Sequence, residues 1–144
     1  AQAEGPIHIQ LADYFQHRHE ETGARAVARQ LYAMADVTPR DIDAAMFFDH
    51  FGPAVLLSLE DYGVCAPGES GPFVAAGNIA WPDGALPVNT HGGSLSEAFI
   101  HGYNHILEGV RQIRGTSTCQ VQDAELVLVT SSNTDPTGAV LLRR

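Results

Sequence analysis

The amino-acid sequence predicts an α/β domain in which helices cover a sheet that ends with two neighbouring antiparallel strands. Helical periods and apolar runs follow one another in the order helix, strand, helix, long loop, helix, strand, strand. The last two strands, at 124–130 and 138–143, are joined by the short polar segment SSNTDPT, which favours antiparallel pairing. At 144 residues, the chain has the length of a single domain.

The first elements of the domain are a predicted helix, a short turn and a buried strand. Thr22 is placed to cap a helix over residues 23–37. Pro39 favours a short helical turn directly after Thr38. The apolar run AAMFFDHF then predicts a buried strand that ends at Asp49. The apolar face of the helix is expected to contain Ala24, Val27, Ala28, Leu31 and Met34.

A second helix is predicted directly after this strand. Pro53 lies in its first turn and Gly63 lies just past its end. From residue 66 to residue 89 the composition is that of a long loop. Residues 1–21 show no sustained period, so we interpret them as an N-terminal arm and assign residues 22–144 to the domain.

A third, longer helix is predicted from Ser94 to Gly115. Glu97 lies three residues after Ser94, and the pair has the pattern of a capping box. Gly115 is suited to end the helix. The apolar stripe of this helix is expected to contain Leu95, Phe99, Tyr103, Ile106, Val110 and Ile113.

Composition argues against several classes of function. The chain has 17 acidic residues, 8 arginines and no lysine, and its net charge of −9 repels phosphate backbones, so no nucleic-acid partner is expected. No apolar run is long enough for a membrane span. Cys65 and Cys119 form no metal or redox pattern, which favours a cytoplasmic setting. His101 and His105 are one helical turn apart, but no third ligand accompanies them, so no metal site is expected.

Several motifs in a fixed order resemble the C-terminal half of the thiolase superfamily. They are DIDAAMFFDHF, LEDYGVC, LPVNTHGGSLSEAFIHG and LVLVTSSNTDPTGAVLL. The sequence is most similar to the lipid-transfer-protein-type thiolases, which include the aldolases of steroid side-chain degradation. Asn89, Gly92 and Gly93 match the Asn-x-x-Gly-Gly turn of the family. The resemblance implies a mixed five-stranded sheet covered by helices.

The departures from the thiolase pattern concern the groups that carry protons. The nucleophilic cysteine of thiolases lies in the N-terminal half. The histidine of their Gly-His-Pro motif corresponds to Phe99 here, and an Asn or His that precedes an acidic residue corresponds to Phe48. Their late cysteine falls on Ser131 or Ser132. A phenyl ring carries no proton and a serine without its own base is a poor nucleophile, so these changes remove Claisen chemistry.

Three residues remain as candidates for proton transfer. His91 lies in the turn before the paired glycines, and His50 follows the buried strand. Tyr103 follows Phe99 by one helical turn. Asp49 is placed to orient such a histidine, although each candidate can equally have a structural role. The residues expected to shape the pocket are Phe48, Asp49, Phe99, Asn89, Gly92, Gly93, Ser132 and Thr134. The resemblance further implies that the loop at Asn133 and Thr134 supplies backbone N–H groups to an oxyanion site.

The resemblance also implies partners and leaves two classes of function open. A lone thiolase half exposes an apolar seam, so we expect a complementary N-terminal thiolase-like chain or half, with the assembly forming a dimer. A small partner protein with an OB fold and a zinc ribbon is also implied. The first class is a subunit or half of a thiolase-like carbon–carbon lyase, a retro-aldolase for the side chain of a steroid or a similar acyl group. In it this chain shapes the acyl pocket, the substrate is a coenzyme A thioester and no cofactor is bound. The second is a non-catalytic scaffold within a complex.

Overall fold

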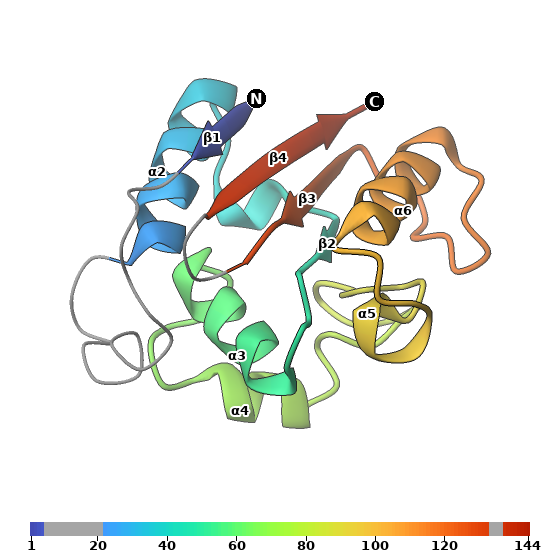
Figure 1. Cartoon of the computed structure of the whole chain (residues 1–144), viewed down its shortest axis with the longest axis horizontal. Helices are drawn as coiled ribbons and strands as arrows, with labels where there is room; N and C mark the ends of the chain where they lie inside the picture. The colour runs from blue at the N-terminus through green and yellow to red at the C-terminus, as the bar shows by residue number, and fades with distance from the viewer. Residues whose placement is uncertain (5–21, 133–136) are drawn as a thin grey trace.

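A four-stranded mixed sheet forms the centre of the structure. The computed structural model describes residues 1–4, 22–132 and 137–144. The strands are β1 (Gln2–Glu4), β2 (Ala44–Met46), β3 (Leu126–Thr130) and β4 (Gly138–Arg143), in the spatial order β1-β4-β3-β2 (Figure 1). β2 runs parallel to β3, whereas β3 and β4 are antiparallel with Leu128 opposite Leu141. The antiparallel pairing predicted for the last two strands is therefore confirmed.

The described residues contain four strands rather than the expected five. At the edge of the sheet beyond β2, a single parallel bridge joins Ala45 and Val88. The Ala45 N–H donates to the Pro87 carbonyl at 3.1 Å, and the Asn89 N–H donates to the Ala45 carbonyl at 2.9 Å. Pro87 has no N–H to extend this ladder, and Asn89 has a φ of 48°, so pairing stops after one bridge. The bridge nevertheless places the turn after Asn89 beside the end of β2.

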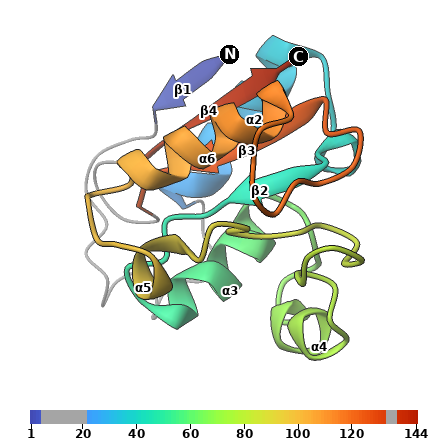
Figure 2. The same cartoon turned by 90° about the vertical axis from the view of Figure 1, so that its right-hand side faces the viewer.

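Helices cover both faces of the sheet (Figures 1 and 2). They are α2 (Gly23–Ala35), α3 (Gly52–Asp61), α4 (Ser70–Ala75), α5 (Gly93–Ser96) and α6 (Tyr103–Arg114). The cluster on the side of α2 and α3 includes Phe47 and Leu128, whereas the cluster on the side of α6 includes Met46 and Val127. Because neighbouring residues of a strand point to opposite faces, β2 and β3 contribute to both cores.

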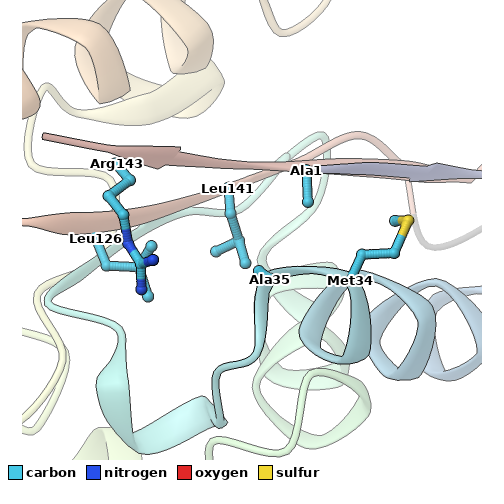
Figure 3. Close-up of a pocket in the computed structure, with 6 residues that line it drawn as sticks. All are labelled: Ala1, Met34, Ala35, Leu126, Leu141 and Arg143. Carbon is cyan, nitrogen blue, oxygen red and sulfur yellow. The ribbon is translucent and has the colours of Figure 1, made fainter.

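The first helix begins as predicted, but one residue of its apolar face is exposed. Thr22 Oγ1 accepts a hydrogen bond from the Arg25 N–H at 3.1 Å, which confirms Thr22 as the N-cap. Met34, expected in the core, is 57% exposed. It lies in the last turn of α2, at the rim of an open hollow of about 490 Å³ that is also lined by Leu126 and Leu141 (Figure 3).

The elements around α3 agree with the prediction, with one addition. A short 3₁₀ turn (Pro39–Asp41) follows Thr38, whose N–H and hydroxyl both donate to the Asp41 carboxylate. α3 has Pro53 in its first turn, and Gly63 follows its end with a φ of 73°. The predicted long loop contains the helix α4, which is only 6 residues long and has too few apolar positions for a helical period.

The helix predicted from Ser94 to Gly115 is interrupted, which corrects that prediction. α5 is only 4 residues long, and α6 begins at Tyr103 after a non-helical segment. His101 and Gly102 have φ angles of 53° and 84°, in the left-handed region that a right-handed helix cannot include. Ser94 makes no capping bond, because Gly92 is the N-cap of α5.

The buried face of α6 is polar, so the predicted apolar stripe is wrong. Tyr103, Ile106 and Leu107 are 69%, 44% and 51% exposed. A Cβ at Gly109 would lie 2.7 Å from a methyl carbon of Val129, so the helix packs closely against β3 through this glycine. The buried residues of α6 are Asn104, His105, Glu108, Gly109 and Gln112.

A network around the Glu108 carboxylate explains how α6 buries polar side chains. Glu108 Oε1 accepts hydrogen bonds from the Thr90 hydroxyl at 2.7 Å, from Gln112 Nε2 at 3.0 Å and from the Ser117 hydroxyl. Gln112 Nε2 also donates to the Cys119 carbonyl at 2.9 Å. Because the buried polar atoms satisfy one another, the polar face can pack on the sheet.

Candidate functional site

Asp49, just beyond the end of β2, is the centre of the candidate site. Asp49 is buried, with only 4% of its surface accessible to solvent. The Ser94 N–H donates to Asp49 Oδ1 at 2.7 Å, and the Leu95 N–H donates to Oδ2 at 3.3 Å. Nε2 of His105 lies 3.0 Å from Oδ1. Burial raises the pKa of Asp49, but these backbone hydrogen bonds and His105 outweigh it, so the pKa lies below its usual value and the carboxylate is ionised at neutral pH.

The two glycines of the turn allow this close approach. Gly92 and Gly93 have φ angles of 103° and 67°. A Cβ added at Gly93 would lie 2.1 Å from Asp49 Oδ2, far inside van der Waals contact. Glycine is therefore required at both positions for the backbone conformation, and at Gly93 also for the contact with the carboxylate.

His105, which the sequence analysis considered only as half of a metal pair, is part of the site. Its side chain is fully buried, and its Nδ1 lies 3.0 Å from Asn104 Oδ1. Burial lowers the pKa of His105, although the Asp49 carboxylate acts in the opposite direction. His101 is exposed, and no group of residues suited to a metal occurs in the described part of the chain. A helix that begins after Gly102 has a polar face that includes His105, Glu108 and Gln112, and this face is the sequence signal that identifies His105.

His91 packs directly against His105. Its side chain is 3% exposed, and its ring centroid is 5.0 Å from that of His105 at an interplanar angle of 85°. Neither ring nitrogen has a hydrogen-bond partner among the described residues, and the nearest carboxylate oxygen, on Glu97, is 3.7 Å from Nε2. Burial and the proximity of His105 lower the pKa of His91, so the imidazole is neutral at pH 7.

Buried polar atoms without a partner gather in this turn. Among the described residues they include Asn89 Oδ1, Ser94 Oγ and both ring nitrogens of His91. Asn89 is itself fixed, because its Nδ2 donates to the Phe47 carbonyl at 2.9 Å. Buried polar groups in native proteins are nearly always hydrogen-bonded, so this concentration of unpaired atoms marks the turn as a candidate binding site.

Phe48 joins the polar site to a set of aromatic rings. Its ring centroid is 6.0 Å from that of Phe99, 5.8 Å from that of His105 and 5.2 Å from that of His50. His50 is partly buried, and its ring stacks on Phe48. The structure thus brings the two phenylalanines at the former proton-carrier positions together, beside Asp49 and His105.

Of the other predicted site residues, one faces outward, one follows β3 and one lies outside the described residues. Tyr103 is 69% exposed, on the outer face of α6, and is not enclosed with His91 and Asp49. Ser132 is partly buried, two residues past the end of β3, where the Phe48 N–H donates to the Thr130 hydroxyl at 3.2 Å. Thr134, with Asn133, lies outside the described residues, so the oxyanion loop stays a prediction. No described helix has both the length and the hydropathy that a membrane span requires.

Comparisons with known proteins agree with the resemblance. The family model described as thiolase C-terminal domain-like matches residues 9–137. The 17-hydroxy-3-oxo-4-pregnene-20-carboxyl-CoA lyase of Mycobacterium tuberculosis is 50% identical over 116 residues, which are 81% of this chain and 30% of the relative. The steroid side-chain-cleaving aldolase of Thermomonospora curvata is 46% identical, over 99% of this chain and 36% of the relative.

A solved structure, the Ltp2-ChsH2(DUF35) aldolase, superposes with a TM-score of 0.88 at 44% identity, covering 99% of this chain and 38% of that chain. The chain thus spans about a third of the length of these relatives. Four strands, the covering helices and the Asn-x-x-Gly-Gly turn are all in place. The chain belongs to the thiolase superfamily, as a thiolase C-terminal-like domain with a mixed sheet between helices.

Proposed function

We propose that this chain is the C-terminal half of a carbon–carbon lyase that cleaves a β-hydroxyacyl coenzyme A thioester by a retro-aldol reaction, with a steroid side chain as substrate. The names of the two relatives above support the reaction and the substrate class. The structural observation that carries the proposal is His91: a neutral, almost fully buried imidazole with two unpaired nitrogens, in the glycine turn anchored on Asp49.

The absent thiolase groups are compatible with this reaction. In a retro-aldol cleavage, a base removes the proton of the β-hydroxyl, the carbon–carbon bond breaks as the ketone forms, and the electron pair passes to the thioester enolate. The enolate is then protonated at carbon. No acyl-enzyme forms, so no thiolate is needed, and the phenylalanines at positions 48 and 99 do not prevent the chemistry.

Within this reaction we assign His91 as the base that removes the proton of the reacting hydroxyl. A neutral imidazole accepts a proton through its unprotonated nitrogen, and its low pKa keeps that nitrogen available near neutral pH. Phe48 and Phe99 pack on each other, and Phe48 contacts the His105 ring against which His91 packs. The coenzyme A thioester is a substrate in this proposal, and the domain holds no cofactor of its own.

The partners are part of the proposal. Leu95, Phe99, Ile100, Tyr103, Ile106 and Leu107 are all large and exposed, and all lie on α5, α6 or the segment between them. Such a gathering is typical of an interface, and the relatives have about three times the length of this chain. We assign this surface to an N-terminal thiolase-like half. The solved relative is named for two components, which supports a heteromeric assembly. That the second partner is of the OB-fold and zinc-ribbon kind, and that the assembly is a dimer, comes from the family resemblance alone and is part of this proposal.

The test is acyl-CoA cleavage by the intact protein that contains this chain, purified with its partners. The variant His91→Ala should lower kcat by about 100-fold or more, the usual contribution of a general base. His101→Ala, which changes an exposed histidine close in sequence, is the matched control and should retain activity.

Full activity of the His91→Ala variant would remove His91 from the mechanism. The scaffold alternative is favoured by the missing proton carriers at Phe48 and Phe99. It predicts a stable assembly in which no variant of this chain changes a rate constant.

A further inference from the structure

His105 has no part in the proton transfers described above, yet its ring is the most completely fixed group at the site. The side chain is 0% exposed. Nε2 lies 3.0 Å from the Asp49 carboxylate, and Nδ1 lies 3.0 Å from the Asn104 side-chain oxygen. Asn104 is fixed in turn, because its Nδ2 donates to the Ala98 carbonyl at 2.9 Å. Both neighbouring oxygens are hydrogen-bond acceptors, so the neutral ring donates its single N–H to Asp49, and the Asn104 side chain borders the Nδ1 end without a second hydrogen bond.

The His91 ring, in contrast, is held by packing and by a longer contact of 3.7 Å between Nε2 and the Glu97 carboxylate. No hydrogen bond within the described residues fixes either nitrogen, and the side chain contacts the His105 ring edge to face, with centroids 5.0 Å apart. A buried imidazole without hydrogen bonds takes its orientation from the surfaces around it. The orientation of the His91 ring therefore depends on where His105 lies.

Asp49 links both sides of this contact. One carboxylate accepts the Ser94 and Leu95 N–H groups, which fixes the end of the turn that carries His91, and it also contacts His105 Nε2. The main chain that holds His91 and the ring that orients it are thus anchored on the same two oxygen atoms. A shift of the His105 ring would change the direction of the His91 nitrogens without moving the turn.

We infer that His105 and Asp49 form a positioning pair that orients the His91 ring toward the reacting hydroxyl of the substrate; this inference rests on the function proposed above. His105 does not touch the substrate in this arrangement. It acts through His91, as an outer group acts on a catalytic one. Neither the metal-site spacing with His101 nor a surface role accounts for its contacts.

The inference has a consequence for pH dependence, because four titratable groups influence His91. His105 lowers the pKa of His91, whereas Glu97, Glu108 and Asp49 raise it. Removing the imidazole of His105 removes the repulsion between two adjacent protonated rings, so the pKa of His91 rises. His91 then becomes protonated at a higher pH, and the acid limb of the pH–rate profile moves to higher pH.

The experiment measures kcat, KM and the pH–rate profile of the intact assembly with three variants. His105→Gln keeps an N–H for Asp49 but has no titrating ring; it should lower kcat about tenfold or more, change KM less than about threefold, and move the acid limb to higher pH. Glu97→Gln should move the limb in the opposite direction. Asn104→Leu replaces the side chain that borders the Nδ1 end of the His105 ring and should lower kcat in the same sense as His105→Gln, by a smaller factor.

The outcomes separate this inference from the proposed function. If His91→Ala abolishes cleavage while His105→Gln retains the wild-type kcat and acid limb, the positioning role is overturned and the proposed function stands. If His91→Ala is fully active, the proposed role of His91 fails first. If His105→Gln does not assemble, Asn104→Leu decides: wild-type kcat in that variant contradicts a positioning role.

Discussion

At the scale of single residues, the position of the Asp49 carboxylate requires glycine at position 93, and the turn that contains Gly93 holds the carboxylate in place. The carboxylate comes so close to the turn that the hydrogen of glycine is the only substituent that fits, and the left-handed φ of Gly93 independently favours glycine. In return, the turn directs the Ser94 and Leu95 N–H groups at the carboxylate. Two residues 44 positions apart in the sequence thus form one structural unit.

Replacing Gly93 with alanine should destabilise the protein. The added methyl group must displace the Asp49 carboxylate and the backbone is strained at positive φ, so a loss of about 1–3 kcal/mol or more in the free energy of unfolding is expected. Denaturant unfolding of the intact protein measures it. The control is Gly71→Ala in α4, where an added Cβ meets no atom within 4 Å and no positive φ is required. Equal unfolding free energies for the two variants would contradict the structural role assigned to Gly93.

At the scale of elements, α6 buries a polar face against the sheet and exposes most of the apolar face that its sequence pattern predicts as buried. Tyr103, Ile106 and Leu107 face outward, whereas Ile113 packs against the sheet. The polar side chains of the helix meet the sheet through the network around Glu108. A helix of this kind is stable only if the buried polar atoms find partners and the outer apolar face is covered. The first condition is met within the chain, and the second requires a partner.

Replacing Glu108 with alanine tests the first condition. The Thr90, Gln112 and Ser117 donors would lose a common acceptor, and we expect a loss of about 1–3 kcal/mol in the free energy of unfolding. Thermal or denaturant unfolding of the intact protein measures it. Glu125→Ala removes an exposed carboxylate and should stay within about 0.5 kcal/mol of the wild type. The network would have no stabilising role if both variants unfolded like the wild type.

Local sequence signals predicted several elements correctly, but they gave a wrong start for the helix predicted from Ser94. The Thr22 cap, the Pro53 helix start and the antiparallel closing strands involve residues near one another in sequence, so their patterns were sufficient. The capping box at Ser94 and Glu97 failed because the Ser94 N–H is taken by Asp49, and because two left-handed residues interrupt the helix before Tyr103.

At the scale of the whole molecule, the exposed residues of α5, α6 and the segment between them form one apolar surface. Each of these six large side chains is at least 44% exposed in this chain alone. Scattered exposed apolar residues are common on protein surfaces, but a gathering along one helix and its approach marks an interaction surface. The function proposed above assigns an N-terminal thiolase-like half to this surface.

A charge on this surface should prevent assembly without unfolding the domain. Leu107 is 51% exposed, so Leu107→Asp should leave the circular dichroism spectrum of the domain unchanged while a complementary N-terminal half no longer co-purifies with it. Arg40→Ala, on the exposed 3₁₀ turn after α2, is the control and should assemble normally. Light scattering after size exclusion measures the mass of each assembly; normal assembly of Leu107→Asp would show that α6 is not the interface.

The sequence by itself determined the family, the order of most elements, the glycine turn and the loss of the usual thiolase proton carriers, because each of these depends on residue types at short, fixed spacing. The tertiary structure alone decided that His105 belongs to the site, that Tyr103 faces outward and that Asp49 anchors the turn. These facts depend on which groups meet across β2, the turn and α6. A hydrogen bond between a carboxylate and a histidine 56 residues away has no local pattern, and the direction of α6 is set by the break before it rather than by its own apolar period.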